Sequence, residues 1–90
     1  MVKGLTKEQQ IKVASEIGGF LMRPSYESAF YLMSGDESRD LMLACLSYFS
    51  QCEEPNFDRL YMQVAWEILK SDIDDDISEY INNRRKSTTE

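Results

Sequence analysis

Neither glycine nor proline occurs between Phe57 and Lys86, and this constrains the fold more than any other feature of the chain. Apolar residues recur through this stretch at intervals of three and four, which predicts one helix from about Arg59 to Lys86. Such a helix is about 42 Å long, whereas a compact chain of this size spans only about 30 Å. The helix is therefore expected either to break near Ser71-Asp72 or to extend beyond the rest of the domain.

Two shorter helices are expected in the first third of the chain. Thr6 and Gln9 have the spacing of a capping box, which predicts a helix that ends or bends at Gly18-Gly19. Ser25 follows Pro24 and is expected to cap a short second helix, from Tyr26 to Met33.

A third helix is expected from the second capping box, Ser34-Gly35-Asp36-Glu37, to about Gln51. Its apolar positions predict a core stripe of Leu41, Ala44, Cys45, Tyr48 and Phe49. A loop containing Pro55 follows, and either Asn56 or Asp58 is expected to cap the long helix.

These elements predict an all-α fold, a small bundle of three to four helices with a long C-terminal helix. Ninety residues are expected to form one domain, 1–90, with frayed ends at 1–5 and 87–90. The apolar positions of the long helix are Leu60, Tyr61, Val64, Ala65, Ile68, Leu69, Ile73, Ile77, Tyr80 and Ile81.

The far part of the long helix carries its own apolar stripe, formed by Ile73, Ile77, Tyr80 and Ile81. If that part extends beyond the other helices, the stripe needs a cover, because exposed apolar area costs about 25 cal/mol per Å². We expect a protein partner, most simply a second copy in a homodimer. In the alternative, the helix bends and the stripe packs on the first two helices.

Missing residue types restrict the chemistry. The chain has no histidine, so no histidine general base, triad or zinc ligand set exists, and we expect neither an enzyme nor a small-molecule substrate or cofactor. Cys45 and Cys52 are two helical turns apart, about 10.5 Å, which is too far for a disulfide. Free thiols, a polar N-terminus and the absence of a long apolar run favour a cytoplasmic protein.

An acidic run, Asp72-Ile73-Asp74-Asp75-Asp76, is the most conspicuous candidate metal motif. It matches the first three ligand positions of a calcium loop but has Ile77 where the loop needs glycine and Asn83 where it needs glutamate. We therefore expect no metal site, and the run is interpreted as a solvated acidic face.

A basic cluster, Arg84-Arg85-Lys86, follows the acidic half of the chain. It is a candidate nucleic-acid contact, but the net charge of −6 opposes the approach of phosphate. The preferred interpretation pairs these side chains with the helix C-terminus and with Glu79.

The order of several segments resembles an uncharacterised domain family of phages and prophages. The residues that carry the resemblance lie between positions 20 and 86: Phe20, Tyr26, Leu43 to Phe49, Glu53 to Asp58, Trp66 to Asp76, Tyr80 and Arg84-Arg85-Lys86. The resemblance implies a phage or prophage protein, located in the host cytoplasm, and supplies no catalytic residues.

These observations favour a non-enzymatic protein-interaction module. Within the phage context it would be a replication accessory or an acidic inhibitor of a host defence factor that competes with DNA for a basic groove. The alternative is a nucleic-acid-binding module that uses Arg84, Arg85 and Lys86.

Overall fold

The computed structural model describes residues 2–19 and 23–89; the side chains of Ser25 and of 85–89 are not part of that description. The described chain is all-α, as the sequence predicts: α1 (Lys7–Ile17), a 3-10 helix η1 (Pro24–Tyr26), α2 (Glu27–Tyr31), α3 (Gly35–Gln51) and α4 (Leu60–Thr89). Phe20, the first residue of the family resemblance, lies outside the described residues.

Both capping boxes form as expected. The Thr6 hydroxyl accepts a hydrogen bond from the Gln9 amide, and the Gln9 side chain accepts one from the Thr6 amide. Ser34 and Glu37 make the same reciprocal pair at the start of α3. Gly18 ends α1 with a φ of 83°, a conformation that glycine adopts without steric cost. These local signals therefore fix where α1 and α3 begin and where α1 ends.

Two other cap predictions are wrong. Ser25 lies inside η1, whose cap position is Arg23, and no side chain caps α2. The first turn of α4 closes on the Arg59 carbonyl, which accepts from the amides of Met62 and Gln63, so neither Asn56 nor Asp58 occupies the cap position. Instead Gln63 Nε2 donates back to the Phe57 carbonyl at 2.7 Å.

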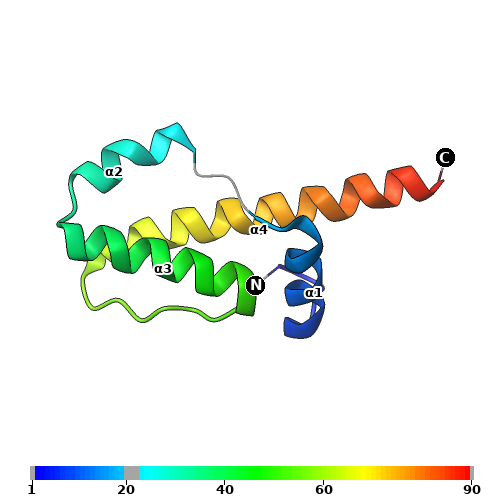
Figure 1. Cartoon of the computed structure of the whole chain (residues 1–90), viewed down its shortest axis with the longest axis horizontal. Helices are drawn as coiled ribbons and strands as arrows, with labels where there is room; N and C mark the ends of the chain where they lie inside the picture. Colours follow the sequence, from blue (N-terminus) through cyan, green and yellow to red (C-terminus); the bar gives the residue numbers. More distant parts are fainter. Residues whose placement is uncertain (1, 20–22, 90) are drawn as a thin grey trace.

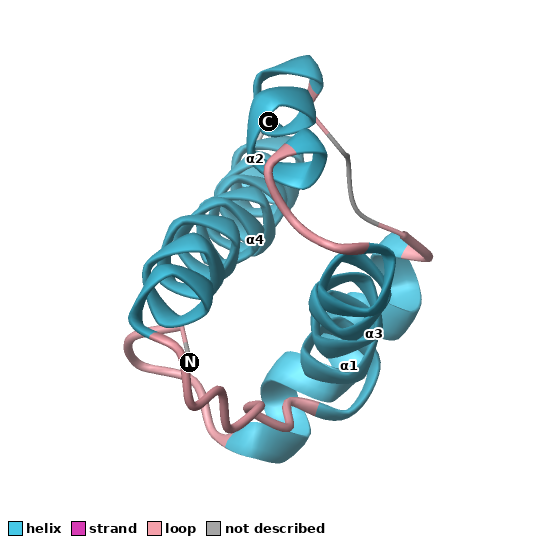
Figure 2. Ribbon diagram, turned by 90° about the vertical axis from the view of Figure 1, so that its left-hand side faces the viewer, coloured by secondary structure: helices cyan, strands magenta, loops and turns pink. Residues whose placement is uncertain are grey.

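α3 and α4 lie side by side and run in the same direction (Figures 1 and 2). Glu37 near the start of α3 bonds Arg59 and Tyr61 at the start of α4, and Tyr48, further along α3, reaches Asp74. Parallel helices require a connection as long as the helix itself. Residues 52–59 provide it, since eight extended residues span about 26 Å, close to the length of α3.

α1 crosses the far end of this pair and packs on both helices, which closes the core (Figure 1). The buried cluster joins Val13 and Ala14 of α1 to the stripe predicted for α3 and to one face of α4; on α4 that face is Met62, Trp66, Leu69, Ile73 and Ile77. The predicted α3 stripe is confirmed, because all five of its side chains are buried.

The first described residue contacts the core. Val2 is buried, and its amide donates to Oε1 of the buried Gln10 at 2.7 Å. α4 continues without a break to Thr89, past its expected end at Lys86. Thirty residues of helix measure about 45 Å, which accounts for the 48 Å long axis of the molecule.

Candidate protein-binding groove on helix α4

The predicted self-association stripe is covered within the chain. Ile73 and Ile77 are 3% and 0% exposed, and Tyr80 and Ile81 pack partly buried against the same core. The expectation that this stripe lacks an intrachain cover is therefore wrong. α4 does not bend to achieve this; α1 crosses it instead, and only the last turns of α4 extend past α1 (Figure 1).

One member of the basic cluster has partners in the described structure. Arg84 Nη1 bonds Glu16 Oε2 at 2.5 Å and its guanidinium lies over the Tyr80 ring, so it joins α4 to α1. The sequence interpretation names the helix C-terminus and Glu79 as partners of this cluster; the structure adds Glu16 of α1 as a partner of Arg84. The side chains of Arg85 and Lys86 lie outside the described residues.

The acidic run is not the solvated face that the sequence suggests. Asp72 and Asp76 both pair with Arg23, and Asp72 also accepts from the Tyr26 hydroxyl. Asp74 accepts from the Tyr48 hydroxyl at 2.6 Å. Alternate carboxylates thus anchor η1 and α3 to α4, and Asp75 is the exposed member of the run. Among the described residues no group of three potential metal-binding side chains is found.

The first turns of α4 expose large apolar side chains. Leu60, Val64 and Ile68 are 75%, 53% and 56% exposed, at a spacing of four residues that places them in one row. The core face in this half of the helix consists of Met62, Trp66 and Leu69 instead, nearly half a turn away.

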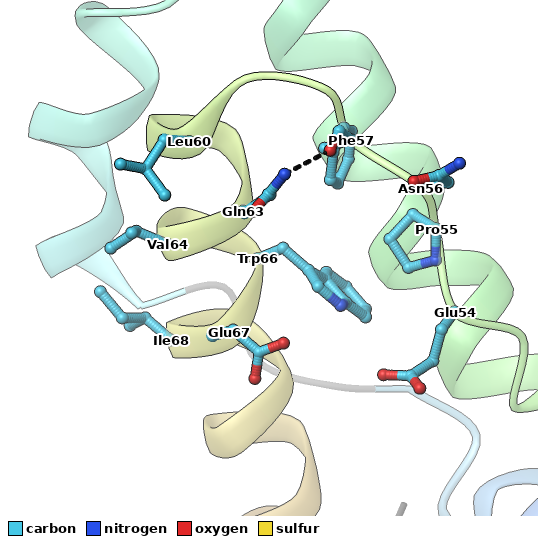
Figure 3. A pocket seen from close by; sticks show the side chains of 10 residues that line it. All are labelled: Glu54, Pro55, Asn56, Phe57, Leu60, Gln63, Val64, Trp66, Glu67 and Ile68. Carbon is cyan, nitrogen blue, oxygen red and sulfur yellow. Dashed lines mark hydrogen bonds between the residues drawn. The ribbon is translucent and has the colours of Figure 1, made fainter.

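A groove runs along this surface, between α4 and the extended connection (Figure 3). One edge is the row Leu60, Val64 and Ile68, and the opposite edge is the segment 54–57. The floor consists of Gln63, Trp66 and Glu67. We call this surface the α4 groove; its volume is about 610 Å³.

The Trp66 side of the groove is held in place by buried contacts. The Trp66 ring meets the ring of the fully buried Tyr48 edge to face, with 5.4 Å between centroids. Lys70 lies over the same Tyr48 ring and pairs with Glu54, which ties the extended connection to α4. The hydrogen bond to Glu54 raises the pKa of Lys70, so the ammonium stays charged over the ordinary pH range. The floor at Trp66 and the edge at Glu54 are therefore preformed.

The charged side chains that line the α4 groove are both acidic, Glu54 and Glu67. Lys70 neutralises Glu54, whereas Glu67 is exposed and forms no ion pair within 4.0 Å among the described residues. Glu53 and Asp58 add exposed carboxylates on the same connection. The groove therefore combines an apolar row with a net negative edge.

The catalytic possibilities of this surface are limited by its residue types. The lining residues include no serine, cysteine, threonine or lysine that could act as a nucleophile. The two free cysteines are buried elsewhere, and burial raises the pKa of Cys45 to about 11, so its thiol stays protonated at neutral pH.

Comparisons with known proteins give no relative. No family model matches the chain, and neither a curated protein nor a solved structure is similar to it. In the described part of the chain, no helix combines the length and the apolar character that crossing a bilayer requires.

Proposed function

We propose that this chain is a non-enzymatic protein-interaction module that binds another protein through the α4 groove. One observation carries the proposal: Leu60, Val64 and Ile68 form a continuous row of side chains that are more than half exposed beside a preformed aromatic floor. A small domain gains nothing in stability from such a row, and contiguous exposed apolar surface is typical of interaction sites.

The stripe of Ile73, Ile77, Tyr80 and Ile81 gives this role little support. Ile73 and Ile77 are buried in the core, so a homodimer formed through them would have to open that core. The proposed binding surface is instead the first half of α4. The resemblance to phage and prophage domains suggests a replication accessory or an inhibitor of a host defence factor, and the genomic neighbourhood distinguishes these two roles.

Site-specific photo-crosslinking tests the proposal. A photoreactive phenylalanine analogue at position 64 is compared with the same analogue at position 46, because Val64 and Leu46 are both 53% exposed and lie on different helices. In the cells that produce the protein, position 64 is expected to give a discrete protein adduct that disappears when Leu60 and Ile68 are replaced by serine. Identical adduct patterns from positions 64 and 46 would overturn the proposal.

A further inference from the structure

The shape of the α4 groove restricts the kind of partner. Its apolar row advances by four residues at each step, from Leu60 to Ile68, and covers about 12 Å of helix. Side chains that are more than half exposed cannot enclose a small molecule, whose sites typically bury most of the ligand. A row of this length instead matches two to three turns of an amphipathic helix, which places its own apolar side chains at intervals of three and four.

The charges restrict the partner further. The groove has two carboxylates, Glu54 and Glu67, and one nearby ammonium, that of Lys70. The adjoining connection carries two more exposed carboxylates, Glu53 and Asp58. A helix that carries lysine or arginine beside its apolar anchors would pair with Glu67, whereas an acidic or phosphorylated segment would be repelled. A second copy of this chain brings the same carboxylates and a net charge of −6, so it is disfavoured for the same reason.

We infer that the occupant of the α4 groove is a basic amphipathic helical segment of another protein, held by apolar contacts to Leu60, Val64 and Ile68 and by ion pairs to Glu67. This rests on the proposed function, because it names the class of partner for the same groove. The apolar contacts supply most of the affinity, and the exposed ion pair contributes a factor of about two to five.

A peptide selection tests the inference. Random sixteen-residue peptides, with acidic and basic residues encoded equally often, are displayed and selected on the intact protein. A Val64→Ser/Ile68→Ser double variant serves for counter-selection, and its thermal melt confirms that it folds; if the double variant is unfolded, Ile68→Ser replaces it. The enriched peptides are expected to be basic, to repeat apolar residues at intervals of three and four, and to bind the variant at least tenfold more weakly.

Fluorescence anisotropy of the best peptide then measures what the Glu67 carboxylate contributes to binding. Glu67→Gln is expected to weaken binding about threefold, and the same change at Glu79, exposed on α4 about 18 Å further along, is expected to have no effect. The Glu67 effect should shrink when salt is added.

Each alternative outcome has a definite meaning. Neutral or acidic peptides that still require Val64 and Ile68 would overturn the basic partner and leave the proposed function intact. Peptides that bind the variant as well as the intact protein would overturn both. A dimer seen by analytical ultracentrifugation that the Val64→Ser/Ile68→Ser change dissociates would identify a second copy as the occupant and overturn the inference.

Discussion

At the scale of single residues, the polar side chains of α4 are as important to the packing as its apolar ones. Tyr48 is fully buried, and its hydroxyl group would be costly in the core without the carboxylate of Asp74. Burial and this hydrogen bond both raise the pKa of Tyr48. An acidic residue that the sequence assigns to a solvated face therefore satisfies the central tyrosine of the core.

Replacing Tyr48 with phenylalanine tests this pairing. The ring contact with Trp66 is retained, but the hydrogen bond to a charged acceptor is lost, so we expect the free energy of unfolding to fall by about 1.5–3 kcal/mol. Urea denaturation followed by circular dichroism measures the change. Tyr31→Phe, at a side chain that is 80% exposed, is the control and should leave the midpoint unchanged. Equal midpoints for the two variants would contradict the buried pairing.

The Cys45 thiol predicts a loss of stability in alkali. Burial raises its pKa to about 11, so the folded chain holds the proton more tightly than the unfolded chain. The stabilising contribution is complete below about pH 9 and is lost as the pH rises toward 11, at up to about 1.4 kcal/mol per pH unit.

The measurement compares the wild type with Cys45→Ala between pH 8 and pH 11. The variant is less stable at pH 8 because of the lost packing, but its free energy of unfolding should fall less steeply above pH 9. Both proteins should still lose some free energy of unfolding above pH 9, since burial raises the pKa of Tyr48 and Cys52 as well. Parallel curves would show that Cys45 does not cause the effect.

At the scale of elements, α2 is attached to the molecule differently from the other helices. None of its residues is buried, and the adjoining Leu32 is 88% exposed. Within α2, Phe30 packs partly buried against the core, and its carbonyl accepts from the Ser38 hydroxyl. The residues just before the helix add polar contacts, where Tyr26 and Arg23 meet Asp72 and Asp76 of α4. A short helix with so few buried contacts should open more easily than the core helices.

Hydrogen exchange should detect this opening. In Arg23→Gln the two ion pairs are lost, so we expect the backbone amides of 25–33 to exchange about fivefold faster, a cost near 1 kcal/mol after screening by solvent. Exchange in α3 should change little. Arg39→Gln removes two exposed ion pairs on α3, with Asp36 and Asp40, and is the control. Uniformly faster exchange throughout the chain would mean that Arg23 supports the whole fold rather than α2.

At the scale of the whole molecule, the arrangement of α1, α3 and α4 determines where along α4 large apolar side chains stay exposed. α3 runs parallel to α4 and α1 crosses their far end, so the C-terminal half of the apolar pattern is buried and the N-terminal half retains an open row. The long axis of 48 Å follows from the continuous helix, and the core lies around its middle turns.

Substitution of Ile77 with aspartate distinguishes an intrachain core from a dimer interface. Ile77 is fully buried, so an aspartate there should cost about 4 kcal/mol or more, which is close to the whole stability of a small domain. The matched change Ile68→Asp, at a side chain that is 56% exposed, should cost less than about 1 kcal/mol.

Thermal unfolding and light scattering of both variants make the measurement. Ile77→Asp is expected to be unfolded at any protein concentration, whereas Ile68→Asp should remain folded. If the wild type is a dimer and Ile77→Asp is a folded monomer, the intrachain packing is contradicted. The stripe of Ile73, Ile77, Tyr80 and Ile81 would then be the dimer interface.

The sequence by itself determines the elements, because the signals that start and stop a helix act within a few residues. The two capping boxes, Gly18 and the absence of breakers after Phe57 predict α1, α3 and α4 to within one to three residues. It does not determine which apolar face of α4 is buried. The first half of α4 has apolar residues on two faces, Leu60, Val64 and Ile68 on one and Met62, Trp66 and Leu69 on the other, and periodicity cannot choose between them.

Only the tertiary structure decides that choice, because burial depends on which helices lie against α4. Ile73 and Ile77 are buried in the core that α1, α3 and α4 form together. Arg23 binds Asp76 and Tyr48 binds Asp74, so contacts between residues 53 and 26 positions apart turn the acidic run toward the rest of the molecule. The same arrangement leaves the α4 groove open. Local patterns thus fix the helices, whereas the candidate site exists only where the packed helices leave an apolar row uncovered.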